Sequence, residues 1–247
     1  MNLKGNTVLI TGGASGIGLA LAERFLQAGN TVIICGRRED KLNEAKTNFP
    51  KLHTRVCDVA SETERIALFE WATKEFPDLN VLVNNAGIQM RTDLQNFQLS
   101  WKEQQNEIAI NFEAPVHLSI LFIPFLKKQA NPVIINVTSG LAFNPGAFAS
   151  VYSATKAALH SFTQTLRYQL TDTNINVIEV APPAVDTDLS APGLHTFGVP
   201  LNEFADAVFE KLKTDELEFG YSTSEAGRKA SPEERKQIFN RINPPKK

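Results

Sequence analysis

A tyrosine and a lysine stand four positions apart at the head of a helical pattern, in the run VYSATKAALHSF. Residues at i and i+4 share one face of a helix, so the Tyr152 phenol and the Lys156 ammonium should be neighbours. A free tyrosine has a pKa of about 10, and a nearby positive charge lowers that pKa by favouring the phenolate. A phenol tuned in this way can exchange a proton with a carbonyl or alcohol oxygen. A surface pair without chemistry is the alternative if no other residue points to the same site.

Two more side chains have the right type for such a site. Ser139 ends the apolar run VIINVTS, where its hydroxyl could donate to a substrate oxygen and polarise it. Asn111, in the run AINFEAP, could anchor a water that leads to Lys156. Each has a structural alternative, because serine is common in turns after strands and asparagine on helix surfaces. The predicted catalytic set is Asn111, Ser139, Tyr152 and Lys156.

A glycine-rich turn supplies the candidate nucleotide site. In TGGASGIG, Gly12, Gly16 and Gly18 lie between a strand pattern and a helix pattern, with Ser15 and Ile17 inside the turn. Glycines let the backbone approach a pyrophosphate, which then lies at the positive N-terminus of the helix. A plain glycine turn is the alternative, but the position between strand and helix favours nucleotide binding.

Two arginines after the second strand bear on the choice of cofactor. Dinucleotide folds bind the ribose 2′-hydroxyl of NAD with an acid at this place, whereas the 2′-phosphate of NADP needs cations. Arg37 and Arg38, in CGRREDKL, supply two guanidinium groups. We therefore predict NADP(H), with NAD(H) as the open alternative, and favour Arg37 because it directly follows Gly36. Either arginine could instead be a solvated residue at a helix start.

Asp58 and Val59 close the third strand pattern, TRVCDV. At that end of the strand the Asp58 carboxylate could accept a hydrogen bond from the adenine amino group. N-capping of the helix that starts near Ser61 would explain Asp58 equally well.

The elements that would position these residues alternate along the chain. Short β-branched runs, several of them apolar on both faces, alternate with longer helical patterns, as in a parallel sheet covered by helices. This alternation predicts an α/β fold, a doubly wound parallel sheet of the Rossmann type in a single domain over 1–247. The predicted strands are Thr7–Thr11, Thr31–Cys35, Thr54–Val59, Val81–Ala86, Val133–Ser139 and Asn176–Ala181. The predicted helices are Ile17–Ala28, Asp40–Asn48, Ser61–Glu75, Ser100–Gln129 and Tyr152–Thr171.

The end of the chain departs from this alternation. Residues 182–200 have no clear periodicity and are predicted to loop over the site, with a helix near Leu201–Lys213; together 182–214 form the substrate-loop region. Residues 215–247 should hold a last strand in EFGYSTS and then a helix. Ser231 would cap that helix, with Pro232 at the first helical position and Glu234 completing a capping box.

Composition argues against several classes of function. The 247 residues are 43% hydrophobic with a net charge of −2, and the scattered basic residues form no field suited to nucleic acid. The longest apolar runs, such as HLSILFIPFL, are too short to cross a bilayer. The first residues lead directly into a strand without a signal-peptide pattern, so we expect a cytoplasmic location. Cys35 and Cys57 lack metal-ligand spacing and fit small core residues of a reducing compartment.

The motifs together resemble the short-chain dehydrogenase/reductase family, over residues from about 3 to 189. They are TGGASGIG, Asp58, the NNAG of Asn84–Gly87, Asn111, Ser139 and the Tyr152-x-x-x-Lys156 pair. The resemblance implies a Rossmann-type domain and an Asn-Ser-Tyr-Lys tetrad at the four catalytic positions. Besides the glycine turn, Arg37, Arg38, Asp58 and Val59, the cofactor contacts are Asn85, Ala86, Gly87, Tyr152, Lys156, Pro182, Val185 and Thr187. The NNAG segment could equally brace the central sheet.

Two features depart from the usual family pattern. PPAVDTDL has Pro183 where relatives usually have glycine, which fixes φ and stiffens the backbone beside the nicotinamide. The ending lacks the glycine-rich strand that commonly completes a tetramer, so we expect a homodimer rather than a tetramer. Both features resemble the DltE-type branch, bacterial oxidoreductases often linked with D-alanylation genes, a link that supplies no substrate.

The predicted function is an NADP(H)-dependent carbonyl reductase or alcohol dehydrogenase that acts on a small molecule and needs no metal. Apolar residues that could line its pocket, or equally pack a loop or a subunit contact, are Leu141, Phe143, Phe148, Leu189, Leu194 and Phe197. The alternatives are an NAD(H)-preferring dehydrogenase and a nucleotide-sensing protein without turnover, against which the intact tetrad argues. A hydrolase built on Ser139 is less well supported, because no G-x-S-x-G elbow accompanies it.

Overall fold

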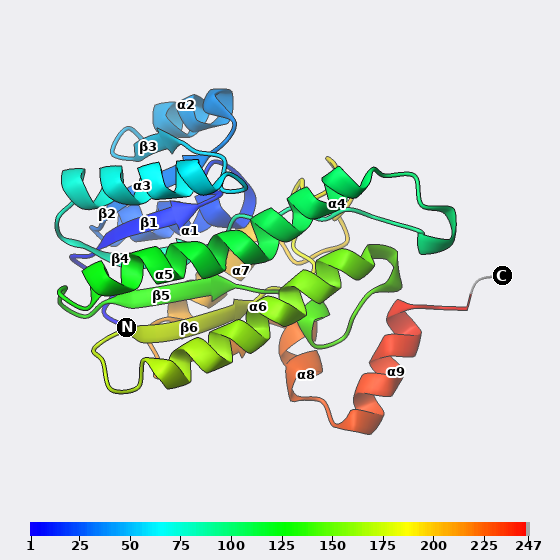
Figure 1. Cartoon of the computed structure of the whole chain (residues 1–247). Coiled ribbons are helices and arrows are strands. Elements are labelled where there is room, and N and C mark those ends of the chain that lie inside the picture. Colours follow the sequence, from blue (N-terminus) through cyan, green and yellow to red (C-terminus); the bar gives the residue numbers. More distant parts are fainter. Residues whose placement is uncertain (246–247) are drawn as a thin grey trace.

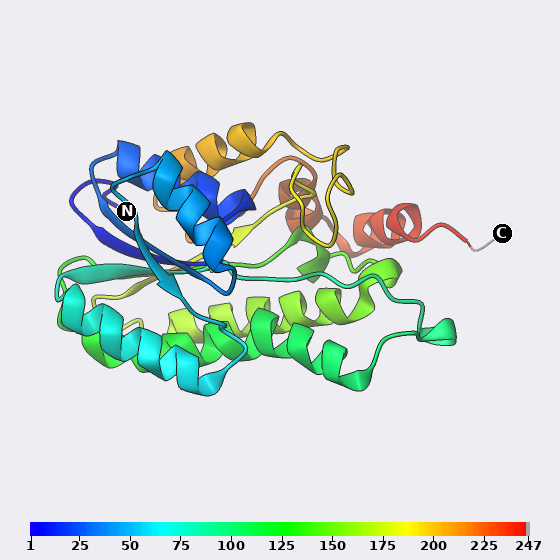
Figure 2. The same ribbon diagram turned by 90° about the horizontal axis from the view of Figure 1, so that it is seen from above.

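The computed structural model describes residues 1–245 and has three layers, a central parallel sheet with helices on both faces (Figures 1 and 2). The seven strands lie in the order β3-β2-β1-β4-β5-β6-β7. Their bounds are β1 (Thr7–Thr11), β2 (Thr31–Gly36), β3 (His53–Val56), β4 (Leu79–Asn84), β5 (Val133–Val137), β6 (Asn176–Ala181) and β7 (Glu218–Gly220). The strand order reverses between β1 and β4, which is the point where doubly wound folds bind their ligands. The α/β, doubly wound prediction is confirmed.

The helices divide between the two faces of the sheet, as Figure 2 shows from above. One face carries α1 (Gly16–Gln27), α2 (Glu39–Asn48) and α7 (Leu201–Lys211). The other face carries α3 (Glu62–Glu75), α4 (Trp101–Ile108), α5 (Ala114–Leu126) and α6 (Ser150–Gln169).

Two apolar cores explain why the strands are hydrophobic on both sides. Within β1, Val8 and Ile10 point into the core under α1, whereas Leu9 points into the core under α5. Phe25 of α1 and Phe122 of α5 are fully buried in these two cores. A parallel sheet covered on both faces requires this continuous run of apolar residues.

The helical stretch Trp101–Leu126 is one rod with a change of pitch in its middle. Residues Ala109–Glu113 form a π-helical turn between α4 and α5. The rod has 26 residues, and its most apolar window of 18 residues has a mean hydropathy of 1.5, so by length and composition it is the one candidate membrane span among the described residues. The expectation that no apolar stretch is long enough to cross a bilayer is therefore wrong as far as length is concerned. The Leu118, Phe122 and Leu126 side chains of the rod are nevertheless packed in the core.

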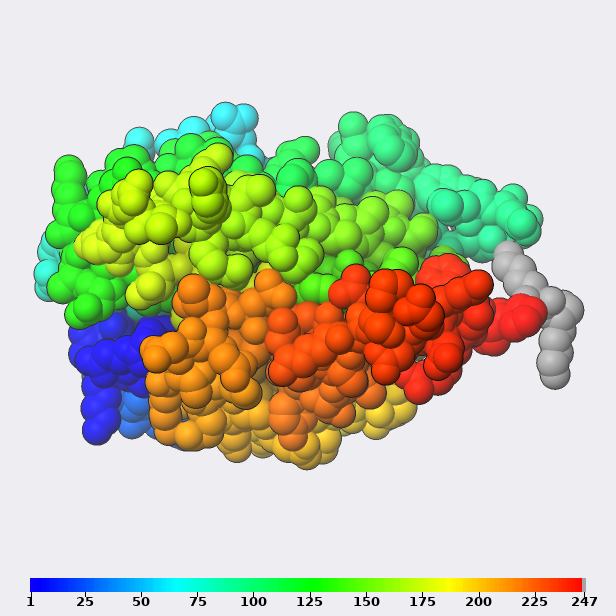
Figure 3. Space-filling model, turned by 90° about the horizontal axis from the view of Figure 1, so that it is seen from below, coloured from blue at the N-terminus to red at the C-terminus, as the bar shows by residue number. Residues whose placement is uncertain are grey.

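The C-terminal segment differs from its prediction. The strand expected over Glu218–Ser224 ends at Gly220, because Ser222 turns the chain with a φ of 51° and α8 (Thr223–Lys229) begins next. The helix α9 (Pro232–Ile242) follows, and the predicted capping box of Ser231 and Glu234 is confirmed. Figure 3 shows this C-terminal segment, in orange and red, lying against the yellow-green surface of α6.

Three strands end earlier than predicted, and this places the candidate residues in loops. The ends at Val56, Asn84 and Val137 leave the following residues at the carboxyl edge of the sheet. The cysteines Cys35 and Cys57 are free and buried in the core, as predicted.

Candidate active site

The turn between β1 and α1 accepts only glycine at key positions. Gly12 has a φ of 64°, and a Cβ on it would lie 2.8 Å from the Cα of Ala86. A Cβ on Gly18 would overlap the carbonyl oxygen of Gly12 and the amide of Asn85. Ser15 is the N-cap of α1 and has no side-chain capping bond, so the first amides of the helix are not closed off by its hydroxyl. This is the backbone cradle that a pyrophosphate requires.

The segment after β4 is bound directly to this turn. The Oγ1 of Thr11 accepts hydrogen bonds from the backbone N–H groups of Asn85 and Ala86, each at 3.0 Å. The Nδ2 of Asn85 donates to the carbonyl oxygen of Thr11 at 2.9 Å. Asn84 points into the sheet layer and donates to Asn136 Oδ1 at 2.9 Å. NNAG therefore braces the sheet, as the structural alternative predicted, and the same segment is held against the glycine turn.

The two arginines after β2 differ in position. Both are exposed, and Arg38 Nη2 donates to Ser15 Oγ in the glycine turn at 3.0 Å. Arg38, which the sequence ranked second to Arg37, is therefore the one that the structure joins to the cradle.

Asp58 lies in the turn beyond β3. Its Oδ1 accepts a hydrogen bond from the N–H of Ala60 at 3.0 Å, and its own N–H donates to Glu64. The N-cap of α3 is Ser61, which accepts from the N–H of Glu64 at 3.3 Å. Asp58 therefore shapes the turn ahead of the helix, and the alternative that it caps α3 itself is wrong. Val59 is buried next to it, with its carbonyl oxygen bound by Arg65.

Three of the four catalytic candidates meet where β5 ends and α6 begins. Tyr152, Lys156 and Ser139 are each less than 9% exposed. The Nζ of Lys156 donates to the carbonyl oxygen of Val137 at 2.9 Å and lies 5.7 Å from the centre of the Tyr152 ring. The Ser139 hydroxyl caps a short helical turn by accepting from the N–H of Leu141 at 3.1 Å. The three side chains therefore form one buried group, not a surface pair.

The ionisation of this group differs from the expectation. Burial raises the pKa of the Tyr152 phenol to about 12, and a hydrogen bond with Ser139 only partly opposes this. Burial also lowers the pKa of Lys156 to about 8. The prediction that neighbouring charge makes the phenol acidic is therefore wrong for the protein's own groups. They keep Tyr152 in its neutral, proton-donating form.

Asn111 is held in the π-helical turn, fully buried. Its Oδ1 accepts from the N–H of Ile88 at 2.9 Å, and its Nδ2 donates to the carbonyl oxygen of Ile88 at 2.8 Å. The Nδ2 also donates to Thr155 of α6 at 3.2 Å. A Cβ on Gly87 would lie 3.4 Å from Asn111 Oδ1 and 3.5 Å from Lys156 Nζ. The NNAG segment therefore lies against both residues, and π turns of this kind frequently occur at functional sites.

The segment after β6 completes the rim of the site. The carbonyl oxygen of Pro182 accepts from the N–H of Gly140, next to Ser139, at 2.8 Å. Val185 is buried, and Thr187 lies 3.5 Å from the position of a Cβ on Gly16. Thr187 is therefore close to the glycine turn, on the side expected for the nicotinamide.

The C-terminal segment supports this rim. Ser224 of α8 donates to the carbonyl oxygen of Ala181 at 2.7 Å. A Cβ on Gly140 would lie 2.9 Å from the Cβ of Ser224, so α8 packs tightly against the backbone that follows Ser139.

A buried ion pair lies behind Ser139 and Lys156. Glu179 of β6 is fully buried and accepts from Thr138 Oγ1 at 2.7 Å, while His160 Nδ1 lies 2.9 Å from its Oε2. The bond to Glu179 raises the pKa of His160. Glu218 comes close enough for His160, Glu179 and Glu218 to resemble a metal-ligand set. Arg228 already pairs with Glu218 at 3.2 Å, so the cluster is an ion-pair network.

The sequence did not single out two polar residues that the structure buries beside this site. Gln104 and Glu107 of α4 are 1% and 0% exposed. Glu107 Oε1 accepts from the N–H of Met90 at 2.8 Å, and the charge of Glu107 is close enough to raise the pKa of Tyr152. The run WKEQQNEI carries no signal for this burial, because it has the composition of a solvated helix.

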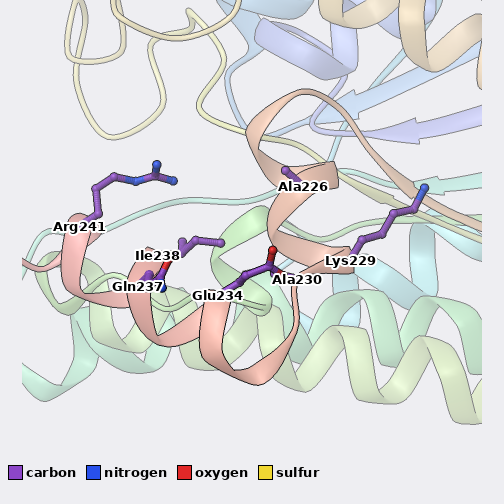
Figure 4. Close-up of a pocket in the computed structure, with 7 residues that line it drawn as sticks. All are labelled: Ala226, Lys229, Ala230, Glu234, Gln237, Ile238 and Arg241. Atoms are coloured by element: carbon purple, nitrogen blue, oxygen red, sulfur yellow. The ribbon is translucent and has the colours of Figure 1, made fainter.

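The predicted apolar wall is only partly available to a ligand. The Phe143 ring makes an edge-to-face contact with His160, with ring centres 4.6 Å apart, and Arg91 lies over the Phe148 ring at 4.7 Å. Phe197 is 77% exposed. A separate surface hollow of about 660 Å³ lies between α8 and α9, as Figure 4 shows, and none of the predicted site residues lines it.

Comparison with known proteins agrees with the fold and the motifs. A sequence model of the family described as short chain dehydrogenase matches residues 6–195. The chain therefore belongs to the short-chain dehydrogenase/reductase family of oxidoreductases. Within that family it is of the DltE type, since it is 50% identical to the uncharacterized oxidoreductase DltE of Bacillus subtilis (strain 168) over 98% of both chains.

Solved structures with the same fold bind nicotinamide cofactors. A short-chain dehydrogenase from Burkholderia cenocepacia J2315, in complex with NADP, aligns with a TM-score of 0.84 and 24% identity, covering 98% of this chain and 99% of that one. A short-chain dehydrogenase/reductase from Burkholderia phymatum, in complex with NAD, also aligns with a TM-score of 0.84, at 19% identity, covering 100% of this chain and 98% of the other. These likenesses extend to the fold alone.

Proposed function

We propose that this protein is an NADP(H)-dependent oxidoreductase that transfers hydride between the nicotinamide and a carbonyl or alcohol group of a small molecule. The observation that carries the proposal is the buried group of Ser139, Tyr152 and Lys156 beside the glycine cradle. Gly87 lies against Lys156 and Asn111, so the cradle and the proton-transferring group belong to one continuous site. A nucleotide-sensing protein has no need of this buried phenol.

Residues of the chain would bind the cofactor, orient the substrate and transfer the proton. The bound nicotinamide supplies the hydride chemistry, and the glycine cradle, free of side chains, fits its pyrophosphate. Tyr152, held neutral, donates its proton to the substrate oxygen, while the Ser139 hydroxyl donates a second hydrogen bond to that oxygen. Lys156 stabilises the phenolate that remains and holds the ribose hydroxyls. The raised pKa favours the neutral phenol, which is the form that donates a proton in carbonyl reduction.

The proton role of Tyr152 is tested by Tyr152→Phe. This change should lower kcat/KM for carbonyl reduction by about 10²–10⁴-fold and leave NADPH binding intact, since the phenyl ring keeps the packing. Tyr168→Phe is the matched control, because Tyr168 is on the same helix and 83% exposed. Near-normal turnover by Tyr152→Phe would exclude the mechanism.

We propose that Arg38, with Arg37 nearby, binds the 2′-phosphate of NADP. The contact of Arg38 with Ser15 supports this, because it keeps a guanidinium beside the cradle. Arg38→Asp should weaken NADPH binding by about tenfold or more and leave NADH binding nearly unchanged. Arg37→Asp is the parallel variant. Equal losses for the two cofactors in both variants would show that these arginines do not bind the 2′-phosphate.

A homodimer and a cytoplasmic location remain predictions. Every residue of α9 is at least partly exposed in the described structure, and the family's usual tetramer strand is absent from the sequence. Light scattering after size-exclusion chromatography should give twice the chain mass of 27.3 kDa.

A further inference from the structure

The helix α4 buries oxygen atoms for which the protein supplies no donor. Within residues 1–245, Gln104 Oε1 and Glu107 Oε2 have no hydrogen-bond partner, although both residues are at most 1% exposed. The other end of each side chain is fixed: Glu107 Oε1 accepts from Met90 N–H, and Gln104 Nε2 contacts Met90 Sδ at 3.4 Å. Buried polar atoms are nearly always paired, so two unpaired acceptors three residues apart on one helix need an explanation.

The position of these oxygens points to the substrate side of the site. Glu107 precedes Asn111 by four residues and so shares its side of the helical rod, and Glu107 is close enough to influence Tyr152. Apart from Asn84 inside the sheet layer, the remaining unpaired atoms come from segments at the same edge of the sheet: Thr92 Oγ1, Asn144 Oδ1, Ser150 Oγ and His195 Nδ1. These segments follow β4, β5 and β6 at the carboxyl edge of the sheet, which is where ligands of this fold bind.

We propose that Glu107, together with Gln104, recognises a hydrogen-bond-donating group of the substrate, a hydroxyl or an ammonium, carried next to the reacting carbonyl. The inference rests on the proposed function and narrows its substrate class. Two acceptors suit a group with one or more N–H or O–H bonds, and an apolar group at this place would leave both oxygens buried and unpaired. The substrate is therefore a polar ketone or aldehyde, not the apolar compound that the predicted wall would favour.

Burial supports this assignment by what it does to the carboxyl group. It raises the pKa of Glu107, because a buried carboxylate loses its contact with water, and a hydrogen-bond donor on a ligand would restore part of that loss. A hydroxyl can pair with either form of the carboxyl group, whereas an ammonium favours the carboxylate. A variant that removes the charge of Glu107 but keeps its shape, Glu107→Gln, therefore distinguishes a hydroxyl ligand from an ammonium ligand.

The experiment compares three ketones of nearly equal size: hydroxyacetone, aminoacetone and 2-butanone, each with NADPH. The wild-type protein should prefer one of the two polar ketones over 2-butanone in kcat/KM by about 10–100-fold, because a site with buried acceptors rejects the analogue without a donor. Glu107→Leu should abolish that preference: the ratio of kcat/KM for the polar ketone to that for 2-butanone should fall to about one. Glu107→Gln, which keeps the shape, should retain a preference for hydroxyacetone and lose a preference for aminoacetone. Glu113→Gln, an exposed glutamate of the same rod, is the matched control.

Three results would overturn the proposal. An equal fall for all three ketones in the Glu107 variants would show that Glu107 only supports the structure. Equal wild-type values for the three ketones would show that no donor is recognised. If the wild type reduces none of them, ligand-observed NMR with NADP⁺ bound decides: selective binding of a polar ketone keeps the recognition role and refutes the proposed reaction, whereas equal or absent binding refutes the recognition role as well.

Discussion

Replacement of His160 tests the ion pair behind the active site. Glu179 has no exposed surface, and its partners are Thr138 and the His160 imidazole. Breaking a buried pair by removing one partner costs about 3–5 kcal/mol because the remaining charge is uncompensated. The His160 side chain is 20% exposed, so water replaces part of the interaction. We therefore expect His160→Gln to lower the free energy of unfolding by about 2–3 kcal/mol at pH 6.

The pH dependence of that loss follows from the direction of the pKa shift. The bond to Glu179 raises the pKa of His160 in the folded protein above its unfolded value of about 6.5. Its stabilisation is therefore complete below the unfolded pKa and is lost as the pH rises through the folded pKa. The difference in unfolding free energy between wild type and His160→Gln should be largest at pH 5.5–6 (about one unit below the unfolded pKa) and should shrink toward pH 9.

Urea unfolding followed by circular dichroism, at pH 6 and at pH 9, measures both quantities. A double-mutant cycle with Glu179→Gln isolates the pair, and a coupling of about 2 kcal/mol is expected at pH 6. His53→Gln is the control: burial lowers the pKa of this exposed histidine on β3, so its effect on the unfolding free energy should not shrink toward pH 9. A loss that is equal at the two pH values, or a cycle without coupling, would refute the ion-pair reasoning.

Three further predictions concern the glycine cradle, the helix α8 and Lys156. Gly18→Ala should lose at least tenfold in NADPH affinity, measured by fluorescence titration, and about 1–3 kcal/mol of stability, because the new methyl group overlaps the Gly12 carbonyl oxygen. Ser224→Ala should lower the unfolding free energy by about 1–2 kcal/mol, since it removes the bond to Ala181 that joins α8 to the site; an unchanged thermal midpoint would contradict this. The reduction rate should fall above about pH 8 as Lys156 loses its charge, and a flat kcat/KM profile from pH 7 to 9.5 would contradict the lowered pKa.

The layers of the fold were predictable because their signal is local. Runs such as VLI in β1 and VII in β2 are apolar at every position, and only a strand buried on both faces needs that pattern. The capping box of α9 was predictable for the same reason, since Ser231 and Glu234 bind each other's backbone within one turn.

The helix α8 was not predictable, because its position depends on a distant contact with β6 as well as on local ones. Glu225 of α8 accepts from the N–H of Gly220 and pairs with Arg228, and Ser224 binds the end of β6. The run EFGYSTSEAG contains no pattern that predicts these contacts. The strand predicted from EFGY was therefore extended too far, to Ser224.

In the active site, residue types were predictable but ionisation and burial were not. The spacing of Tyr152 and Lys156 placed them on one helix, yet the pKa of the phenol depends on how deeply the whole fold encloses it. Glu107 was missed for a related reason: its neighbours on α4 are polar, and only packing against the loop at Met90 buries it.

The π-helical turn at Ala109–Glu113 lies between two halves of the helical rod that have different roles. The half toward Leu126 is fixed by the sheet, while the half toward Trp101 carries the oxygens of Gln104 and Glu107. Because a π turn holds about one residue more than an α turn, deleting one residue from it would close it into an ordinary α-helix and leave the two halves of the rod facing nearly as they do now. The same deletion elsewhere in the rod, where no wide turn absorbs it, would rotate the Trp101 half by about 100° relative to the core. The wide turn is therefore the place where the rod can lose a residue without moving either its buried half or the oxygens of Gln104 and Glu107.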